Sequence, residues 1–241
     1  MKRLFVELFN LVYPPSCLVC KTLLRENSYL CDRCFSQIKF ITASTYCQRC
    51  FYPLNSIEKE VVPLCGNCRN DKYLFKRNYS IAVFDGVFKE MIHLFKYQDK
   101  ELLSVFFSRL MVDFITKYLE ETVDLVSFVP LYRARERARG YNQAYLLANS
   151  IRKSFQIPLA KNILVRVKAN RPQTNLSREQ RRKNVKDVFK AKNVWRVKNK
   201  RILLIDDVFT TGATLNECSK VLVGNGAKEV VALTLARARG S

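Results

Sequence analysis

Residues 202–214 read Ile-Leu-Leu-Ile-Asp-Asp-Val-Phe-Thr-Thr-Gly-Ala-Thr, and this stretch decides the fold. Its apolar start predicts a strand over 202–206, and residues 214–223 have the apolar spacing of a helix. Two carboxylates and a turn rich in hydroxyl groups connect the two elements. In an open α/β sheet, ligands bind at this end of a strand.

The groups in this turn are suited to a phosphorylated sugar. Backbone N–H groups and the positive end of the helix attract a phosphate, and Thr210, Thr211 and Thr214 add hydroxyl donors. Asp206 and Asp207 are placed to accept hydrogen bonds from ribose hydroxyls. A diol or a metal ion between these carboxylates and the phosphate would offset the repulsion between their negative charges. The alternative is an ordinary strand–turn–helix unit with Asp and Thr caps. A P-loop is excluded, because Gly-x-x-x-x-Gly-Lys-[Ser/Thr] does not occur.

The rest of the chain after residue 78 alternates in the same way. The sequence predicts further strands over 79–84, 125–130, 163–167 and 230–235, and helices over 87–97, 101–121 and 142–155. We therefore expect an α/β domain over residues 79–241, with a mostly parallel sheet and helices. His93 falls on an apolar helical stripe, so we expect a buried or half-buried core histidine rather than a general base.

Eight of the nine cysteines lie before residue 69, in four Cys-x-x-Cys pairs: Cys17/Cys20, Cys31/Cys34, Cys47/Cys50 and Cys65/Cys68. Because each pair can aim two thiolates at one ion, four pairs predict two closed zinc sites with four ligands each. Disulfides are the first alternative, and they would need an oxidising compartment. A redox motif is the second, but such a motif typically occurs once in a chain, beside a βαβ unit, and not four times. Three pairings are open, of which the sequential one is the simplest. We expect residues 1–78 to form an amphipathic helix and a small zinc-binding domain, and Cys218 to be a core residue.

The net charge of +21 is concentrated in one part of the chain. Residues 133–201 contain 21 basic and three acidic residues, a net charge of +18 (21 − 3). Such a surface attracts polyanions, of which nucleic acid, polyphosphate and pyrophosphate are the candidates. A membrane surface is a weaker candidate, and a solvated face is the plain alternative. No stretch of 18 apolar residues occurs, so we expect no transmembrane helix.

Two clusters carry much of this charge. The first has arginine at alternate positions, which would point to one side if the chain were extended: Arg133, Arg135, Arg137 and Arg139. The second contains Arg178, Arg181, Arg182, Lys183 and Lys186. Arginine binds phosphates through paired hydrogen bonds, so both clusters are candidates for binding nucleic acid. Four aromatic residues among the charges are candidates for stacking on unpaired bases or for core packing: Tyr132, Tyr141, Phe189 and Trp195.

The motifs, taken in order, resemble the competence-protein F (ComF) family. They are the four cysteine pairs, Val129-Pro-Leu131 with Arg139-Gly-Tyr-Asn-Gln143, Gln173-x-x-Leu176 with Arg181-x-x-Asn184, and the stretch 202–214. The last stretch also resembles the ribose-phosphate signature of type I phosphoribosyltransferases. The resemblance covers the chain from Cys17 to about Leu235. It implies a phosphoribosyltransferase-like parallel sheet preceded by a double zinc ribbon.

The same resemblance implies a site for phosphoribosyl pyrophosphate (PRPP) together with Mg²⁺. Asp206 and Asp207 would hold the ribose 2′ and 3′ hydroxyls. The 5′-phosphate would bind to Thr210, Thr211, Gly212, Ala213 and Thr214. The pyrophosphate would bind to the loop of Pro130, Leu131 and Tyr132, with Arg135 and Arg139 close to it. The second basic cluster falls where this fold keeps a mobile loop.

ComF proteins are associated with DNA uptake in natural transformation. By that resemblance we expect a protein that handles single-stranded DNA in the cytoplasm, near the inner face of the membrane, with a DNA-uptake channel or a competence helicase as a neighbour. The alternative is a metabolic phosphoribosyltransferase that makes a nucleotide from PRPP and a nucleobase, and a third class senses PRPP without turnover. No acceptor-base site or catalytic residue is recognisable in the sequence, so turnover of PRPP stays open. The concentrated positive charge favours DNA handling.

Overall fold

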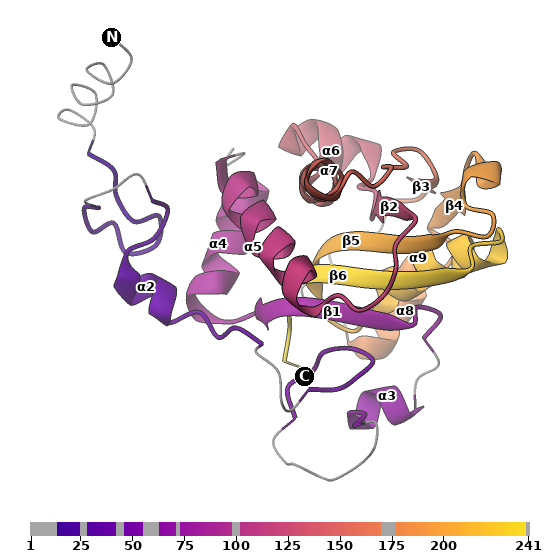
Figure 1. Ribbon diagram of the computed structural model, residues 1–241, viewed down its shortest axis with the longest axis horizontal. Coiled ribbons are helices and arrows are strands. Elements are labelled where there is room, and N and C mark those ends of the chain that lie inside the picture. Colours follow the sequence, from indigo (N-terminus) through magenta and orange to yellow (C-terminus); the bar gives the residue numbers. More distant parts are fainter. Residues whose placement is uncertain are drawn as a thin grey trace.

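The computed structural model describes residues 14–24, 28–41, 46–54, 63–70, 73–97, 102–169 and 177–239. Its centre is a sheet of four parallel strands (Figure 1). In spatial order these are β1 (Arg77–Val83), β6 (Glu229–Arg237), β5 (Arg201–Phe209) and β2 (Leu125–Phe128). The parallel α/β sheet predicted from the sequence is therefore confirmed. The amphipathic helix expected near the N-terminus falls on residues 1–13, which lie outside the described residues.

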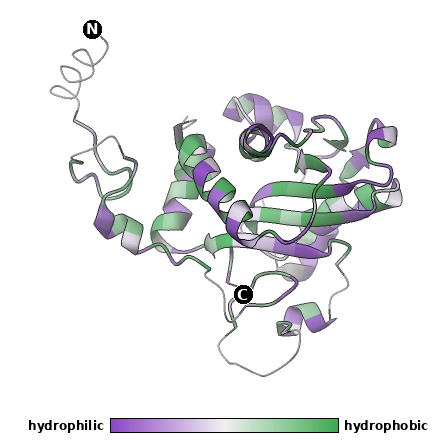
Figure 2. Cartoon of the chain, in the orientation of Figure 1, coloured by the Kyte–Doolittle hydropathy of each residue, from purple (hydrophilic) through white to green (hydrophobic). Residues whose placement is uncertain are grey.

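The middle of the sheet is apolar, and an ion pair connects the amino ends of β5 and β2. In β6 every residue after Glu229 is buried, and Figure 2 shows apolar residues concentrated in β5 and β6. At the start of β5, the Arg201 guanidinium donates to both oxygens of Asp124, at 2.7 and 2.9 Å. This arginine keeps the pKa of Asp124 well below its usual range. Because β5 and β2 are parallel, the carboxyl ends of both strands lie at the same edge of the sheet.

Helices cover both faces of the sheet (Figure 1). On one face lie α4 (Gly86–Tyr97), α5 (Leu102–Tyr118) and α7 (Gln143–Phe155). On the other face lie α9 (Ala213–Gly224), which packs on β5 and β6, and α8 (Arg178–Val185), which packs on α9. A second, two-stranded antiparallel sheet of β3 (Leu164–Arg166) and β4 (Phe189–Ala191) also packs on α9. The described part is completed by the short helices α2 (Asp32–Ser36), α3 (Gly66–Asn70) and α6 (Arg133–Arg139) and the 3₁₀ turn η1 (Val194–Arg196).

The sheet separates two apolar cores, and each core contains one group of cysteines. The core on the side of α4, α5 and α7 includes Cys17 and Cys34. The core on the side of α9 includes Phe75, Phe209 and Cys218, together with Cys47, Cys50, Cys65 and Cys68. The expectation that Cys218 is a core residue is confirmed, since it is fully buried. The domain boundary at residue 78 stays a prediction.

The first arginine cluster is helical, and the extended arrangement considered for it is wrong. Residues 133–139 form α6, which ends at Gly140 in the left-handed conformation (φ 82°). Ala, Arg and Glu favour a helix, but without apolar residues they produce no periodic pattern. Neighbours two apart on a helix point in different directions, whereas those four apart share a face. Arg133 and Arg137 therefore lie on one side, and Arg135 and Arg139 on another.

The prediction for His93 is also wrong. Phe88, Met91, Ile92 and Phe95 of α4 are buried as expected, but His93 is exposed. It lies at the edge of the apolar stripe, and the centre of its ring is 6.0 Å from that of Phe84 and 6.4 Å from that of Tyr97.

In the described part of the chain, no helix combines the length and the hydropathy that crossing a bilayer requires.

Candidate functional site

Two adjacent acidic residues lie near the carboxyl end of the central strand. The strand predicted from the sequence ends at residue 206, whereas β5 continues to Phe209. Asp206 Oδ1 accepts a hydrogen bond from the backbone N–H of Asp207 at 2.9 Å. Burial, followed by the negative charge of Asp207, raises the pKa of Asp206 to about 7. The protonated form of Asp206 is therefore favoured compared with an ordinary exposed carboxyl.

Lys96 belongs to this site, although no sequence pattern pointed to it. Its Nζ lies 2.9 Å from Asp207 Oδ2, and both side chains are only 19% exposed. The last turn of α4 carries this lysine, and the parallel topology brings it to the carboxyl edge of β5. An ion pair with this degree of burial is sensitive to the loss of either partner, which would leave an uncompensated charge. Asp207 is thus neutralised by a cation within the protein.

The turn after β5 has the shape that the sequence predicted. Thr210 and Thr211 connect the strand to Gly212, which is the N-cap of α9 and has a φ of +76°. A Cβ atom at Gly212 would lie 2.5 Å from the ring of Phe209, so this position needs glycine for space as well as for conformation. The backbone N–H of Ala213 donates to the Thr211 hydroxyl at 3.4 Å. The N-terminus of α9 therefore lies at the turn, as a phosphate site requires.

Residues from distant segments hold this turn in place. Arg237 donates to the backbone oxygen of Thr210 at 2.7 Å, and the Tyr73 hydroxyl donates to the backbone oxygen of Thr211 at 2.9 Å. The backbone N–H of Leu74 donates to Asn216 Oδ1 at 2.7 Å, which fixes the first turn of α9. Tyr73 and Leu74 directly follow the cysteine-rich segment. The sequence pattern of the turn alone could not reveal these supports.

The loop proposed for pyrophosphate lies beside the turn. Pro130, Leu131 and Tyr132 connect β2 to α6, and Pro130 is buried. The preceding residue, Val129, donates its N–H to Ile205 of β5 at 2.9 Å and accepts a hydrogen bond from Asn142 Nδ2 at 3.2 Å. Asn142 is also the N-cap of α7 and accepts from the N–H of Tyr145. The two loops are thereby held next to each other, and their roles toward PRPP stay predictions.

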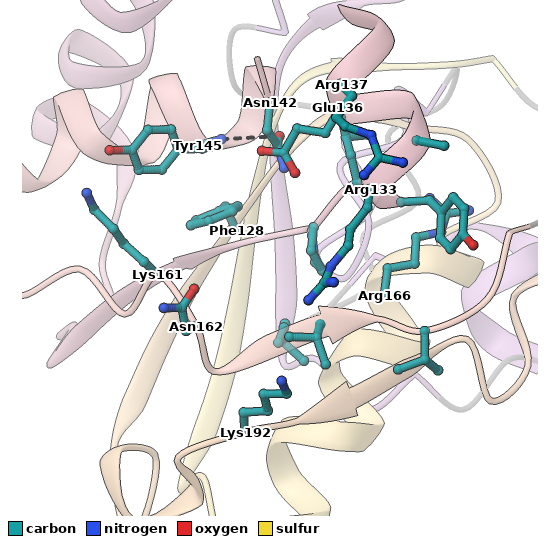
Figure 3. Close-up of a pocket in the computed structure, with 17 residues that line it drawn as sticks. Phe128, Arg133, Glu136, Arg137, Asn142, Tyr145, Lys161, Asn162, Arg166 and Lys192 are labelled. Carbon is teal, nitrogen blue, oxygen red and sulfur yellow. Dashed lines mark hydrogen bonds between the residues drawn. The ribbon is translucent and has the colours of Figure 1, made fainter. Parts of the chain in front are cut away.

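The residues of α6 divide between a cavity and the protein surface. Arg133 and Arg137 line a cavity of about 690 Å³ that also contains Tyr132, Arg166 and Lys192 (Figure 3). Arg139 instead donates to Gln143 Oε1 at 2.6 Å and stacks on Tyr97. Arg135 is exposed and does not line the cavity. The structure therefore brings two of the four arginines together with cations from other segments.

The second basic cluster lies on α8, away from this cavity. Ser177 and Gln180 form a capping box at the start of the helix, and Lys183 pairs with Glu179 at 2.8 Å on the exposed surface. Arg182 and Lys186 are exposed and Arg181 is half-buried, while the side chain of Arg178 lies outside the described residues. Gln173 and Leu176, quoted for the resemblance, are outside them as well. A nucleic-acid role of this cluster stays a prediction.

The four aromatic candidates have different environments. Phe189 is buried in the core, and the Tyr141 hydroxyl donates to the backbone oxygen of Phe95 at 2.6 Å. Both therefore have packing roles. Tyr132 lines the cavity, and Trp195 is 75% exposed. These last two are available for contact with a ligand.

The eight early cysteines form two clusters of the predicted composition. Cys17, Cys20, Cys31 and Cys34 form one cluster, and Cys47, Cys50, Cys65 and Cys68 the other, with the Sγ atoms of each within 4.8 Å of one another. The Sγ atoms are 3.5 Å apart for Cys20 and Cys31 and 3.7 Å apart for Cys50 and Cys65. A tetrahedral zinc ion with Zn–S bonds of about 2.3 Å separates its sulfurs by ~3.8 Å, whereas a disulfide would need about 2 Å.

The donor set and the spacing both fit zinc, so each cluster is a four-cysteine zinc-binding site. The pairing left open by the sequence is the sequential one. Cys20 is exposed, and hydrogen bonding with Thr22 lowers its thiol pKa to about 6. In the same cluster, burial raises the pKa of the Cys34 thiol. Because metal binding requires the deprotonated sulfur, binding of an ion would release the proton of such a thiol.

Residues 8–69 match the family described as double zinc ribbon domain, and residues 140–241 match the phosphoribosyl transferase domain. Competence protein F of Haemophilus influenzae is 34% identical over 87% of this chain and 90% of its own length. The chain belongs to the ComF family. Another similar ComF relative, competence protein ComFC of Bacillus subtilis, is 30% identical over 89% of this chain and 87% of its own. DNA utilization protein YhgH of Escherichia coli K12 is 26% identical over 94% of this chain and 99% of its own.

Two of the solved structures that match part of the chain do so at low identity and low TM-score. Glutamine PRPP amidotransferase from B. subtilis is 19% identical, with a TM-score of 0.37 over 53% of this ComF chain and 26% of its own. Adenine phosphoribosyltransferase from Leishmania tarentolae is 16% identical, with a TM-score of 0.34 over 56% of this chain and 70% of its own. The family matches confirm the fold class predicted from the sequence, a phosphoribosyltransferase-like sheet preceded by a double zinc ribbon.

Proposed function

We propose that this ComF-family chain binds PRPP at the turn after β5 and handles single-stranded DNA on the basic surface beside that turn. The observation that carries the proposal is the distribution of charge at the carboxyl edge of the sheet. A turn with N–H and hydroxyl donors lies there next to a cavity surrounded by cations. Four of these cations form no ion pair within the described part of the chain: Arg133, Arg137, Lys161 and Lys192. A surface of this kind favours a polyanion over a single small metabolite.

The PRPP part of the proposal depends on the turn and the acidic pair. Thr210 to Thr214 would bind the 5′-phosphate, with Gly212 allowing the backbone to come close to it. Asp206 and Asp207 would accept hydrogen bonds from the ribose hydroxyls. Carboxylate and phosphate oxygens are the ligands that Mg²⁺ prefers, so the acidic pair is chemically suited to an ion that accompanies PRPP. When bound, that ion would neutralise charge on the pyrophosphate.

The DNA part of the proposal is supported by charge and by the names of relatives. Residues 133–201 carry a net charge of +18, and the relatives described above are called competence proteins or DNA utilization proteins. We place the activity on incoming single strands in the cytoplasm, near the inner face of the membrane. A DNA-uptake channel or a competence helicase would be the neighbouring partner. Turnover of PRPP is not required for this activity.

The proposal is tested by fluorescence anisotropy of a labelled single-stranded oligonucleotide at several salt concentrations. We expect tight binding at low salt with a logarithmic slope of about −0.7 per phosphate neutralised. The triple variant Arg178→Ala, Arg181→Ala, Arg182→Ala should flatten that slope by roughly two units and weaken binding to all sequences alike. A matched control removes three exposed charges from α5 and α7: Arg109→Ala, Lys117→Ala and Lys153→Ala.

The control should change the slope by less than about one unit, because a distant charge releases no counterion from the bound strand. Equal effects of the two triple variants would mean that binding follows the total charge alone. A flat slope for the wild type, combined with nucleotide synthesis from PRPP and a nucleobase, would favour the metabolic alternative.

A further inference from the structure

A cavity of about 690 Å³ lies between α6, the start of α7 and the small sheet of β3 and β4 (Figure 3). This volume is within the range of about 300–1,000 Å³ that is typical of small-molecule sites. The described residues that line the cavity include the loop 130–132 but none of the turn 206–214. The cavity therefore shares the loop 130–132 with the proposed pyrophosphate site and lies beside the turn proposed for the 5′-phosphate.

Cations from three segments surround this cavity. Arg133 from α6 and Lys192 after β4 point into it from opposite sides, and Arg166 of β3 lies to one side of Arg133 (Figure 3). Among the described lining residues, Glu136 is the one acidic group. Cations that line one cavity favour the binding of an anion there, and arginine is suited to paired hydrogen bonds with phosphate. The charged part of the cavity thus matches a phosphate group.

One end of the cavity is aromatic. The rings of Phe128 and Tyr145 meet edge to face, with centroids 5.4 Å apart, and Lys161 Nζ lies 5.0 Å from the centre of the Tyr145 ring. Asn162 lines this end as well and provides amide donors and acceptors (Figure 3). An aromatic wall with nearby amides suits an unpaired nucleobase, because stacking is available to every base.

Arg166 connects the cavity with the acidic pair. The side chain lines the cavity, and its charge interacts with that of Asp206 in β5. It also stacks on the core residue Phe189, with its guanidinium carbon 5.7 Å from the ring centre. A ligand in the cavity would therefore lie directly beside the ribose-phosphate turn.

We propose that this cavity binds one nucleotide of a single-stranded nucleic acid, with a phosphate between Arg133, Arg166 and Lys192. The base lies at the aromatic end, against Phe128 and Tyr145. The proposal rests on the proposed function, because it states where the bound strand enters the protein. It also implies a preference for single strands, since a paired base in a duplex is not available to the aromatic wall.

The test compares two double variants that each remove one arginine and one lysine. Arg133→Ala with Lys192→Ala removes cations that line the cavity, and Arg152→Ala with Lys190→Ala removes exposed cations that do not. The probe is a labelled hexathymidylate, measured by anisotropy at one salt concentration, with a blunt duplex of about 20 base pairs as a comparison, because a duplex of six A·T pairs would not stay paired. We expect the cavity variant to bind the single strand about tenfold more weakly, the loss expected for a charged hydrogen bond. The control should lose less than about threefold, and duplex binding should be equal for both variants.

A second measurement locates the base. A strand containing 5-iododeoxyuridine is cross-linked by ultraviolet light, and the modified peptide is identified by mass spectrometry. We expect the cross-link at Tyr145 or Phe128, and its loss in the cavity variant.

Four outcomes would overturn the proposal. Equal weakening by the two double variants would show that only the overall field matters. Loss of PRPP binding in the cavity variant, with unchanged binding of the strand, would assign the cavity to pyrophosphate. If the wild type binds no single strand at all, the proposed function fails together with this inference. Binding that is insensitive to the cavity variant overturns the inference alone.

Discussion

The guanidinium of Arg237 donates a hydrogen bond to the backbone oxygen of Thr210, and the same side chain contacts the second cysteine cluster. The two atoms of the hydrogen bond are 2.7 Å apart, and Arg237 Nη2 lies 3.8 Å from Cys50 Sγ. Arg237 is only 3% exposed, and its guanidinium carbon lies 4.5 Å from the centre of the Phe209 ring. A buried cation is stabilised by thiolates nearby, so the turn after β5 and the second cysteine cluster share one side chain.

Replacement of Arg237 by Met should loosen the turn. The variant leaves the backbone oxygens of Thr210 and Ala238 without this donor, so we expect a loss of about 2–4 kcal/mol in the free energy of unfolding. Urea unfolding measures the loss, and hydrogen exchange of residues 209–214 should become faster. Arg201→Met is the control, because its ion pair lies at the opposite end of the same strands. It should cost much less than Arg237→Met, because the pair is partly exposed to solvent, and it should leave exchange in the turn unchanged. Unchanged hydrogen exchange of residues 209–214 in Arg237→Met would show that Arg237 does not hold the turn in place.

The two zinc sites should differ in their effect on this turn. Elemental analysis of the purified protein should find close to two zinc ions per chain, and chelation should destabilise the cysteine-rich segment, since metal binding there contributes folding energy. Cys50→Ser should accelerate exchange of residues 209–214, because its sulfur contacts Arg237. Cys20→Ser, in the first cluster, should lose zinc without this effect. Protein that is free of zinc, or disulfides found by mass spectrometry, would contradict the assignment of the metal.

Substitution of Gly212 by Ala should damage the turn more than the same change elsewhere in α9. The added Cβ meets the Phe209 ring, and the positive φ is unfavourable for alanine, so we expect a cost of about 1–3 kcal/mol. At Gly224 a Cβ atom meets nothing within 4 Å. Gly224→Ala should therefore be neutral or stabilising by up to about 1 kcal/mol. Thermal and urea unfolding compare the variants, and similar costs at both positions would show that Gly212 is not constrained.

The raised pKa of Asp206 should appear as a pH dependence of stability. Its pKa is about 7 in the folded protein against an ordinary value of 3.8. Between these values the folded state holds a proton that the unfolded chain has released, so this contribution to stability is lost as the pH rises toward 7. The variant Asp206→Asn should therefore gain stability relative to wild type from about pH 4 to pH 8, on the order of 2–4 kcal/mol.

Urea unfolding at a series of pH values checks this, with Asp124→Asn as the control. Arg201 lowers the pKa of Asp124, so its contribution is present above the ordinary pKa and is lost only in more acidic solution. The difference between Asp124→Asn and wild type should be constant over the same range. A constant difference for Asp206→Asn as well would mean that this carboxyl titrates normally.

Much of the fold follows from local patterns, because the sheet strands and the long helices carry apolar runs or stripes. Val230 to Leu235 and the stripe of α4 were predicted from those patterns and are buried. The helix α6 was missed, since its arginines and alanines have helical propensity without an apolar face. The strand β4 was missed as well, because a run of three residues is too short for a periodic signal.

The parts of the site that sequence reasoning missed depend on tertiary packing. Lys96 meets Asp207, and Arg237 meets Cys50, only because the sheet order brings distant segments to the same edge. The cavity has the same origin, since Arg133, Arg166 and Lys192 come from three separate segments. The cysteine spacing, in contrast, predicted two closed sites, and the structure selected one pairing among three.

Isothermal titration of PRPP with Mg²⁺ tests the central claim most directly. The wild type should bind PRPP, whereas the double variant Asp206→Ala, Asp207→Ala should show no binding, because it lacks the acceptors proposed for the ribose hydroxyls. Circular dichroism and urea unfolding would establish that the variant is folded at the temperature of the titration. Equal affinity of the two proteins for PRPP, or no heat of binding with the wild type, would contradict the account.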